Sequence, residues 1–162
     1  MFRIEALNKR HNRKGFDCGE PALNAFLQQY ASQLQKRFAA QVYVALDEQE
    51  QVAGFYSLSV TQIERAQSPE HLGQFSPYQP IPAALIGRLA TNQQHQGQGV
   101  GRYLLAHALV TIRQAAALIG IAVVVVDAKN AEVAGFYRRF GFVELEPGGL
   151  RLCLLVNTLK TP

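Results

Sequence analysis

The stretch QHQGQGVGRYLL, residues 94–105, places three glycines at alternate positions directly before a run of helix-forming residues. It follows AALIGRLAT, residues 83–91, whose apolar residues indicate a strand. A strand that enters a glycine-rich turn and then a helix leaves free backbone N–H groups at the positive end of the helix dipole. Such an arrangement is an anion site, most often for phosphate. This stretch therefore decides both the fold class and the kind of ligand that we expect.

Two common phosphate-binding motifs do not fit these residues. A nucleotide P-loop requires Lys and then Ser or Thr after its last glycine, whereas Arg102 and Tyr103 follow Gly101. The dinucleotide fingerprint G-x-G-x-x-G would require a glycine at position 102, and it belongs to the first strand of a repeated parallel unit. A third kind of phosphate loop is therefore needed.

Hydrophobic periodicity in the rest of the chain predicts one mixed α/β sheet with helices packed on it. Helices are expected at residues 20–38, 99–120 and 131–140, the first with an apolar face of Leu23, Phe26, Leu27, Tyr30 and Leu34. Strands are expected at residues 2–6, 40–47, 52–65, 83–91, 121–128, 142–146 and 150–156. The valines of 121–128 indicate a strand buried on both faces, and the prolines of 66–80 indicate a loop.

Four residues mark where these elements begin, end or approach one another. Gly54, inside the strand 52–65, predicts a bulge or a close approach. Asn130 is suited to cap the helix 131–140, and Gly141 is suited to end it at the C′ position. Gly120 is expected to end the helix 99–120.

Length and composition are those of one globular domain. The chain has 162 residues, of which 48% are hydrophobic and 17% charged, so we expect a single domain over residues 1–162. No apolar run reaches the roughly 20 residues that a membrane span requires. The N-terminal residues lack the apolar stretch of a signal peptide. We therefore expect a cytoplasmic protein with no membrane partner.

Cysteines and charged residues narrow the ligand classes further. Cys18 and Cys153 are too few for a disulfide framework and lack metal-site spacing, so we expect reduced thiols and no metal. Sixteen Lys and Arg against twelve Asp and Glu give a net charge of +4, which favours an anionic partner. Solvated surface charge is the alternative interpretation of the two basic clusters. The clusters are Lys9, Arg10, Arg13 and Lys14, and Arg138 with Arg139.

The glycine stretch resembles the coenzyme A loop of a known family. Residues 96–101, QGQGVG, match the Q/R-x-x-G-x-G/A pattern of the GNAT superfamily of N-acetyltransferases, in which this loop cradles the pyrophosphate of acetyl-CoA. The resemblance continues through most of residues 83–142, including GFY at 135–137 and RFGF at 139–142. It implies a single mixed, mostly antiparallel sheet of about seven strands, flanked by helices and with a splayed central strand pair.

The resemblance also implies which residues bind acetyl-CoA, the expected co-substrate. Backbone N–H groups around residues 89–91 would bind the thioester oxygen, and Tyr137 would lie beside the sulfur. Arg138 and Arg139 are candidates for the 3′-phosphate. The implied cofactor-binding residues are Leu89, Ala90, Thr91, Gln96, Gly97, Gln98, Gly99, Val100, Gly101, Arg102, Asn130, Phe136 and Tyr137.

Tyr137 is the candidate catalytic residue, because the departing thiolate needs a proton. A phenol with a pKa near 10 is protonated at neutral pH. Full transfer to a thiolate, whose thiol has a pKa near 8.5, is uphill by roughly 1.5 units, or about 2 kcal/mol. We therefore expect Tyr137 to act by hydrogen bonding as charge develops. A core position is the alternative, although Phe136 and Phe140 suit that role better.

The strand before the loop contains no carboxylate, whereas some members of the superfamily carry a glutamate there as general base. At pH 7 a lysine amine is neutral in about one molecule in 2,500, and an α-amino group in roughly one in seven. An enzyme without a strong base therefore suits an α-amine. Glu64 or Asp127, acting through water, is the alternative.

The N-terminal segment narrows the acceptor. Residues 16–27, FDCGEPALNAFL, resemble the F-D-C-G-x-x-x-L-N-x-x-L opening of acetyltransferase toxins from type II toxin–antitoxin pairs. This resemblance implies acetylation of the α-amino group of aminoacyl-tRNA, a ribbon-helix-helix antitoxin and a possible homodimer. The candidate tRNA contacts are Lys9, Arg10, Arg13, Lys14, Lys36, Arg37, Arg65 and Arg88.

Two other functions remain open at this point. An acetyltransferase for a small amine, such as a polyamine or an amino acid, would share every cofactor feature. A non-catalytic acyl-CoA-binding module would need the loop but not Tyr137. The glycine stretch alone does not separate these alternatives, because it identifies the donor and not the acceptor.

Overall fold

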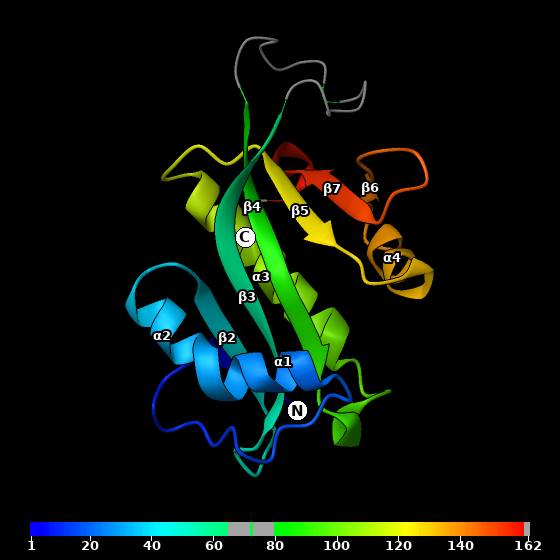
Figure 1. Ribbon diagram of the computed structural model, residues 1–162. Helices are drawn as coiled ribbons and strands as arrows, with labels where there is room; N and C mark the ends of the chain where they lie inside the picture. The colour runs from blue at the N-terminus through cyan, green and yellow to red at the C-terminus, as the bar shows by residue number, and fades with distance from the viewer. Residues whose placement is uncertain (65–71, 73–79, 161–162) are drawn as a thin grey trace. The chain divides into compact units, whose positions relative to one another are not determined.

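The computed structural model describes residues 1–64, 72 and 80–160 (Figure 1). Most of the loop expected at 66–80, together with the candidate Arg65, lies outside the described residues. The strands are β1 (Arg3–Ala6), β2 (Gln41–Leu46), β3 (Val52–Ile63), β4 (Ile81–Thr91), β5 (Val123–Asp127), β6 (Val143–Glu144) and β7 (Arg151–Leu155). The helices are α1 (Pro21–Ala25), η1 (Phe26–Tyr30), α2 (Ala31–Lys36), η4 (Gln93–His95), α3 (Val100–Ala116), α4 (Ala131–Arg138) and η5 (Val156–Thr158).

The strands form one seven-stranded sheet in the order β1-β2-β3-β4-β5-β7-β6. Strands β4 and β5 pair in parallel, whereas the β1–β2, β2–β3, β5–β7 and β6–β7 pairs are antiparallel. The parallel ladder covers residues 83–86 of β4, and β4 then continues to Thr91. The expected mixed, mostly antiparallel sheet is confirmed.

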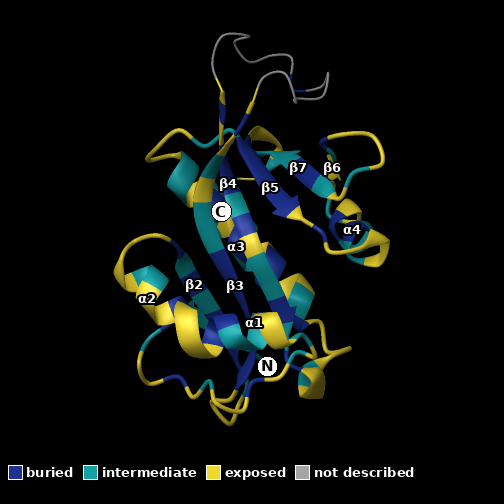
Figure 2. Cartoon of the chain, viewed as in Figure 1, coloured by how far each residue is buried: buried dark blue, intermediate teal, exposed yellow. Residues whose placement is uncertain are grey.

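The chain divides into two compact units, each with its own core. The first consists of Met1–Ser59 and Gly87–Ala108, and the second of Val60–Ile86 and Leu109–Pro162. In the first core Phe55 contacts two rings, edge-on to Phe16 at 5.5 Å and stacked with Phe26 at 5.9 Å between centroids. In the second, the four valines of β5 are fully buried, as their unbroken apolar run predicts (Figure 2).

The first helical segment differs from the continuous helix expected at 20–38. Phe26–Tyr30 forms a π-helical turn between α1 and α2, in which the N–H of Ala31 donates to the carbonyl of Phe26. The π turn changes the phase of the following residues relative to an α-helix. Ala31 is therefore fully buried, whereas Tyr30, expected in the apolar face, is 53% exposed.

The residues expected to end or cap elements act largely as predicted. A carbon at the Cβ position of Gly54 would lie 2.7 Å from the carbonyl oxygen of Ala90, and the β2–β3 register shifts beside Gly54. The side chain of Asn130 caps α4 by accepting from the N–H of Val133 at 2.9 Å. Gly141 has a φ of +96° and ends α4. Gly120 does not end α3, which already stops at Ala116.

Candidate cofactor loop and acceptor pocket

The residues before the glycines are held by hydrogen bonds to β3 and to the β2–β3 turn. Asn92 is buried, and its N–H donates to the carbonyl of Ala53 at 2.8 Å. Its side-chain oxygen accepts from the N–H of Gln94, which starts η4. Nε2 of His95 lies 2.9 Å from Oδ2 of Asp47. The loop therefore begins from a fixed base.

The cofactor loop, residues 96–101, has the backbone that its glycines allow. Gly97 and Gly99 have φ values of +80° and +81°, and a Cβ at either position would meet nothing within 4 Å. These glycines are required by conformation rather than by space. Val100 is buried and begins the 17-residue helix α3. The first N–H groups of a helix lack partners within the helix, so they suit a pyrophosphate, and the loop fits coenzyme A.

The end of β4 supplies the backbone that the sequence assigned to the thioester oxygen. Leu89 and Thr91 are half-buried and Ala90 is buried. The absence of a side chain on Gly54 lets the carbonyl of Ala90 approach β3 closely. Residue types at 89–91 matter little to such a role, because only main-chain N–H groups would act.

The two sequence motifs meet in the first unit. The N–H of Gln93, just before the cofactor loop, donates to the carbonyl of Asp17 in the FDCG segment at 2.8 Å. Gly19 has a φ of +88°, and a Cβ there would lie 2.7 Å from Nε2 of Gln93. The side chain of Asn24 accepts from the N–H of Cys18 at 2.9 Å and donates to Oδ1 of Asp17 at 3.1 Å. The motif therefore connects α1 to the cofactor loop.

Tyr137 lies in the second unit, on α4. It is 6% exposed and contacts the rings of Phe136 and Phe142 at 5.3 and 5.5 Å. Its hydroxyl has no hydrogen-bond partner among the described residues. Burial raises the pKa of Tyr137 to about 12, so the phenol is protonated across the physiological range.

The charged residues near α4 are mostly paired with each other. Both carboxylate oxygens of Asp127 accept from Arg151, at 2.8 and 3.0 Å. Arg138 pairs with Glu144 at 2.6 Å, and Arg139 is exposed. The exposed carboxylate of Glu64 accepts from the side chain of Gln62 at 2.9 Å. The pairing of Asp127 with Arg151 makes it a poor general base.

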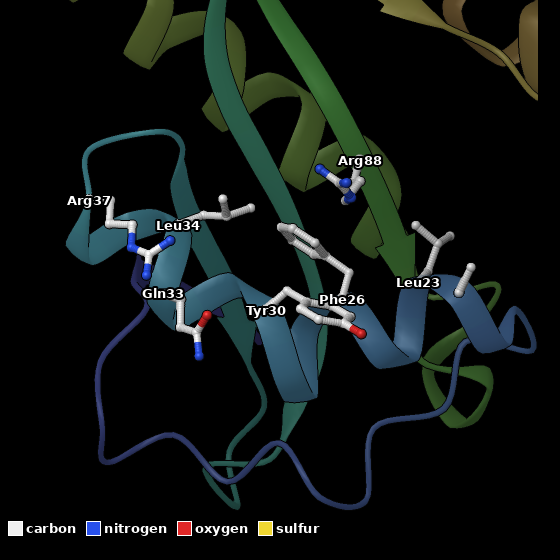
Figure 3. Close-up of a pocket in the computed structure, with 8 residues that line it drawn as sticks. Leu23, Phe26, Tyr30, Gln33, Leu34, Arg37 and Arg88 are labelled. Atoms are coloured by element: carbon white, nitrogen blue, oxygen red, sulfur yellow. The ribbon is translucent and has the colours of Figure 1, made fainter.

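A pocket of about 420 Å³ opens beside the first helices, and we call it the α1–α2 pocket (Figure 3). The guanidinium carbon of Arg88, from β4, lies 3.7 Å from the centre of the Phe26 ring. Burial lowers the pKa of Arg88, and no carboxylate pairs with it among the described residues. The lining residues are Ala22, Leu23, Phe26, Tyr30, Gln33, Leu34, Arg37 and Arg88, with no acidic side chain.

The candidate tRNA contacts do not all form one surface in the described structure. Arg37 and Arg88 share the α1–α2 pocket, and Lys36 is exposed on α2. Lys9, Arg10 and Lys14 are exposed in the segment between β1 and α1. Arg13 differs, because it donates to the Ser32 hydroxyl at 2.6 Å and to the Leu27 carbonyl at 3.3 Å, and so fastens that segment to the helices.

Sequence reasoning missed the aromatic and amide residues of the pocket. Phe26 and Tyr30 were assigned to an apolar helix face, and Gln33 was given no role. The π turn that exposes Tyr30 has no sequence signal of its own, since the segment also fits an ordinary amphipathic helix. A half-buried arginine on β4 was the one available indication.

A glycine loop at the start of a helix, after a strand whose parallel ladder stops short of its end, defines a class of enzyme that binds coenzyme A thioesters. A family model described as an acetyltransferase (GNAT) domain matches residues 39–144. The chain belongs to the GNAT acetyltransferase family.

Relatives that match most of the chain point to one group within this family. A probable toxin TacT of Sinorhizobium fredii is 33% identical, covering 98% of this chain and 93% of the relative. A tRNA-acetylating toxin of Mycobacterium tuberculosis is 32% identical, covering 90% and 86%. The structure of AtaT complexed with acetyl-methionyl-tRNAfMet has a TM-score of 0.88 and 31% identity, covering 98% and 96%. AtaT has also been solved with acetyl-CoA and with the C-terminus of the antitoxin AtaR.

Proposed function

We propose that this protein transfers the acetyl group of acetyl-CoA to the α-amino group of an aminoacyl-tRNA and thereby blocks translation. Relatives named as tRNA-acetylating toxins, similar over nearly the full chain, support the reaction class. The FDCG segment, which resembles the opening of these toxins, contacts the base of the cofactor loop through Gln93.

The observation that carries the choice of acceptor is the charge of the α1–α2 pocket. Arg37 and Arg88 line it, no acidic side chain does, and neither arginine has a carboxylate partner among the described residues. A polyamine is cationic at neutral pH and would be repelled by this lining. An acceptor with phosphates near its amine is attracted, and the 3′ end of a charged tRNA has this chemistry.

The chemistry that we propose requires little acid–base assistance. The neutral α-amine attacks the thioester carbon, the carbon–sulfur bond breaks, and the sulfur retains the electron pair. Backbone N–H groups at residues 89–91 stabilise the oxyanion, and the cofactor loop binds the pyrophosphate. The proton lost by the amine passes to solvent, because the strand before the loop holds no carboxylate and Asp127 is paired with Arg151.

Tyr137 is proposed to donate a hydrogen bond to the developing thiolate. With a pKa of about 12, it is a weaker acid than a thiol with a pKa near 8.5 by roughly 3.5 units, or about 5 kcal/mol. Complete proton transfer from Tyr137 is therefore less favourable than an unperturbed phenol would suggest. Its contribution is stabilisation of negative charge in a nearly dry environment.

The remaining partners are proposed from the same resemblance. We propose that the two units work as one catalytic domain, and that the protein acts in the cytoplasm. A ribbon-helix-helix antitoxin is proposed to silence it, and a homodimer is proposed as its assembled form; AtaT has a structure with the antitoxin AtaR. No helix in the described part of the chain is long and apolar enough to cross a membrane.

The direct test is acetyl transfer to purified charged tRNA. Labelled acetyl-CoA is incubated with the protein and a mixture of aminoacyl-tRNAs, and acetylated aminoacyl-tRNA is measured. Uncharged tRNA, polyamines and free amino acids are the parallel acceptors. Label on charged tRNA alone supports the proposal. Label on polyamines or free amino acids alone would replace it with a small-amine acetyltransferase, and binding of acetyl-CoA without any transfer would indicate a non-catalytic module.

A further inference from the structure

Phe38 has a backbone conformation that a bulky residue rarely adopts. Its φ is +59°, in the left-handed region. Its N–H donates to the carbonyl of Gln35 at 3.1 Å, and the N–H of Ala39 donates to that of Leu34 at 2.9 Å. These bonds end α2 in a Schellman arrangement with Phe38 at C′, where glycine and asparagine are favoured. A phenylalanine therefore makes this turn less stable.

Burial does not compensate for this unfavourable conformation. The side chain of Phe38 is 87% exposed, and it contacts no other ring among the described residues. Glycine would relieve the strain and would cost little apolar contact. Strained residues that the core does not use are concentrated at ligand-binding sites.

The neighbours of Phe38 indicate the chemistry of the ligand. Lys36 and Arg37 directly precede it, and Arg37 lines the α1–α2 pocket together with Arg88 and the half-exposed Tyr30. None of these three cations has a carboxylate partner in the described part of the chain. Cations that follow a phosphate backbone, beside exposed rings that stack on bases, are typical of binding to single-stranded nucleic acid.

We propose that Phe38 is a stacking platform for an unpaired nucleobase at the 3′ end of the acceptor tRNA, beside phosphate contacts made by Arg37 and Arg88. The inference rests on the proposed function, because it takes tRNA as the acceptor. Phe38 acts as a positioning residue: its ring holds the end of the strand and does not touch the reacting atoms. A protein partner is the competing occupant, and the unpaired cations beside the ring favour nucleic acid over it.

Phe38→Gly separates this role from a structural one. Removing the ring and the strain together should leave the Tm equal or higher, while kcat/KM for charged tRNA falls about tenfold through KM. Acetylation of an amino acid amide, an acceptor without a nucleobase, should not change. Leu118→Gly is the matched control, because Leu118 is 85% exposed in the second unit. If Phe38→Gly lowers the Tm, Phe38→Asn, which tolerates the same backbone, replaces it.

The chain contains no tryptophan, so Phe38→Trp introduces a single fluorescent probe at the proposed platform. We expect uncharged tRNA to quench this tryptophan, and blunt-ended duplex RNA of the same length to leave it unquenched. This binding needs no acetyl transfer, so quenching without transfer would refute the proposed function and keep the platform. Transfer to charged tRNA with no quenching and unchanged Phe38→Gly kinetics would refute the platform. Loss of antitoxin binding alone in Phe38→Gly would assign Phe38 to a protein interface.

Discussion

The cofactor loop and the α1–α2 pocket lie in the same unit but are specified by the sequence in different ways. In the loop, Gly97 and Gly99 have positive φ values, so the residue types themselves reveal the backbone. In the pocket, Tyr30 and Arg37 are placed by a π turn and by the strained end of α2. A donor site that depends on backbone conformation can be read from glycines. An acceptor site that depends on helix phase cannot.

The largest effect is expected from a residue that breaks the loop without touching the pocket. Gly99→Val forces a branched side chain into a φ of +81°, and a displaced loop should lower kcat/KM for acetyl-CoA about 100-fold. Steady-state kinetics with varied acetyl-CoA measure it, and fluorescence of the Phe38→Trp background should show unchanged tRNA binding. Gly120→Ala is the control, since Gly120 is exposed and has no left-handed φ. Equal losses for the two variants would show that the conformation of Gly99 is unimportant.

Tyr137→Phe should act on turnover alone. Loss of the hydroxyl should reduce kcat by about 100-fold or more, while KM for acetyl-CoA stays constant. Because this buried hydroxyl has no partner among the described residues, the Tm should not fall. In the parent protein, kcat/KM should rise with pH through the α-amine pKa of about 8 and then stay level to about pH 10, since Tyr137 is still protonated there. A falling limb below pH 10 would contradict the assigned tyrosine.

Substitution in the pocket should affect the acceptor and leave the donor unchanged. Arg88→Met keeps contact with the Phe26 ring but removes the charge, and we expect about a tenfold higher KM for charged tRNA. The KM for acetyl-CoA and the Tm should change little, because no carboxylate loses a partner among the described residues. Lys160→Met, at an exposed site in the second unit, is the control. An unchanged KM for tRNA would remove Arg88 from the acceptor site.

The smallest effect is expected in the basic segment before α1, and it distinguishes two kinds of arginine. Replacing Lys9, Arg10 and Lys14 together by Gln should raise KM for tRNA by roughly threefold and reduce its salt dependence, without altering the Tm. Arg13→Gln should instead lower the Tm, because Arg13 holds Ser32 and the Leu27 carbonyl. Identical salt slopes for the triple variant and the parent protein would show that this segment does not contact tRNA.

The parts that sequence reasoning predicted are those with a local physical rule. Valines in β5, the Asn130 cap and the ending of α4 at Gly141 follow from burial, capping and backbone rules, and all are confirmed. The end of α3 was placed too late, because Gly120 is also suited to the turn that follows the helix. The partner of Asp127 could not be predicted, since Arg151 is distant in sequence and pairs across the β5–β7 ladder.

Side-chain neighbourhoods in the first unit were the least predictable feature. The FDCG segment was identified by its letters, but its hydrogen bond to Gln93 joins residues more than seventy positions apart. No periodicity encodes such a contact. The assignment of Tyr137 and of the loop residues to catalysis remains a prediction until the kinetic tests are made.

The π turn at Phe26–Tyr30 holds one residue more than the α-helical turn it replaces. A single-residue deletion in this turn should rotate the side chains of α2 by roughly 100° relative to those of α1. The face that meets the acceptor would then be exchanged with little change in the residues of the sheet. Acceptor preference in related chains can therefore diverge through the length of this one turn, as well as through substitution of the residues that line the pocket.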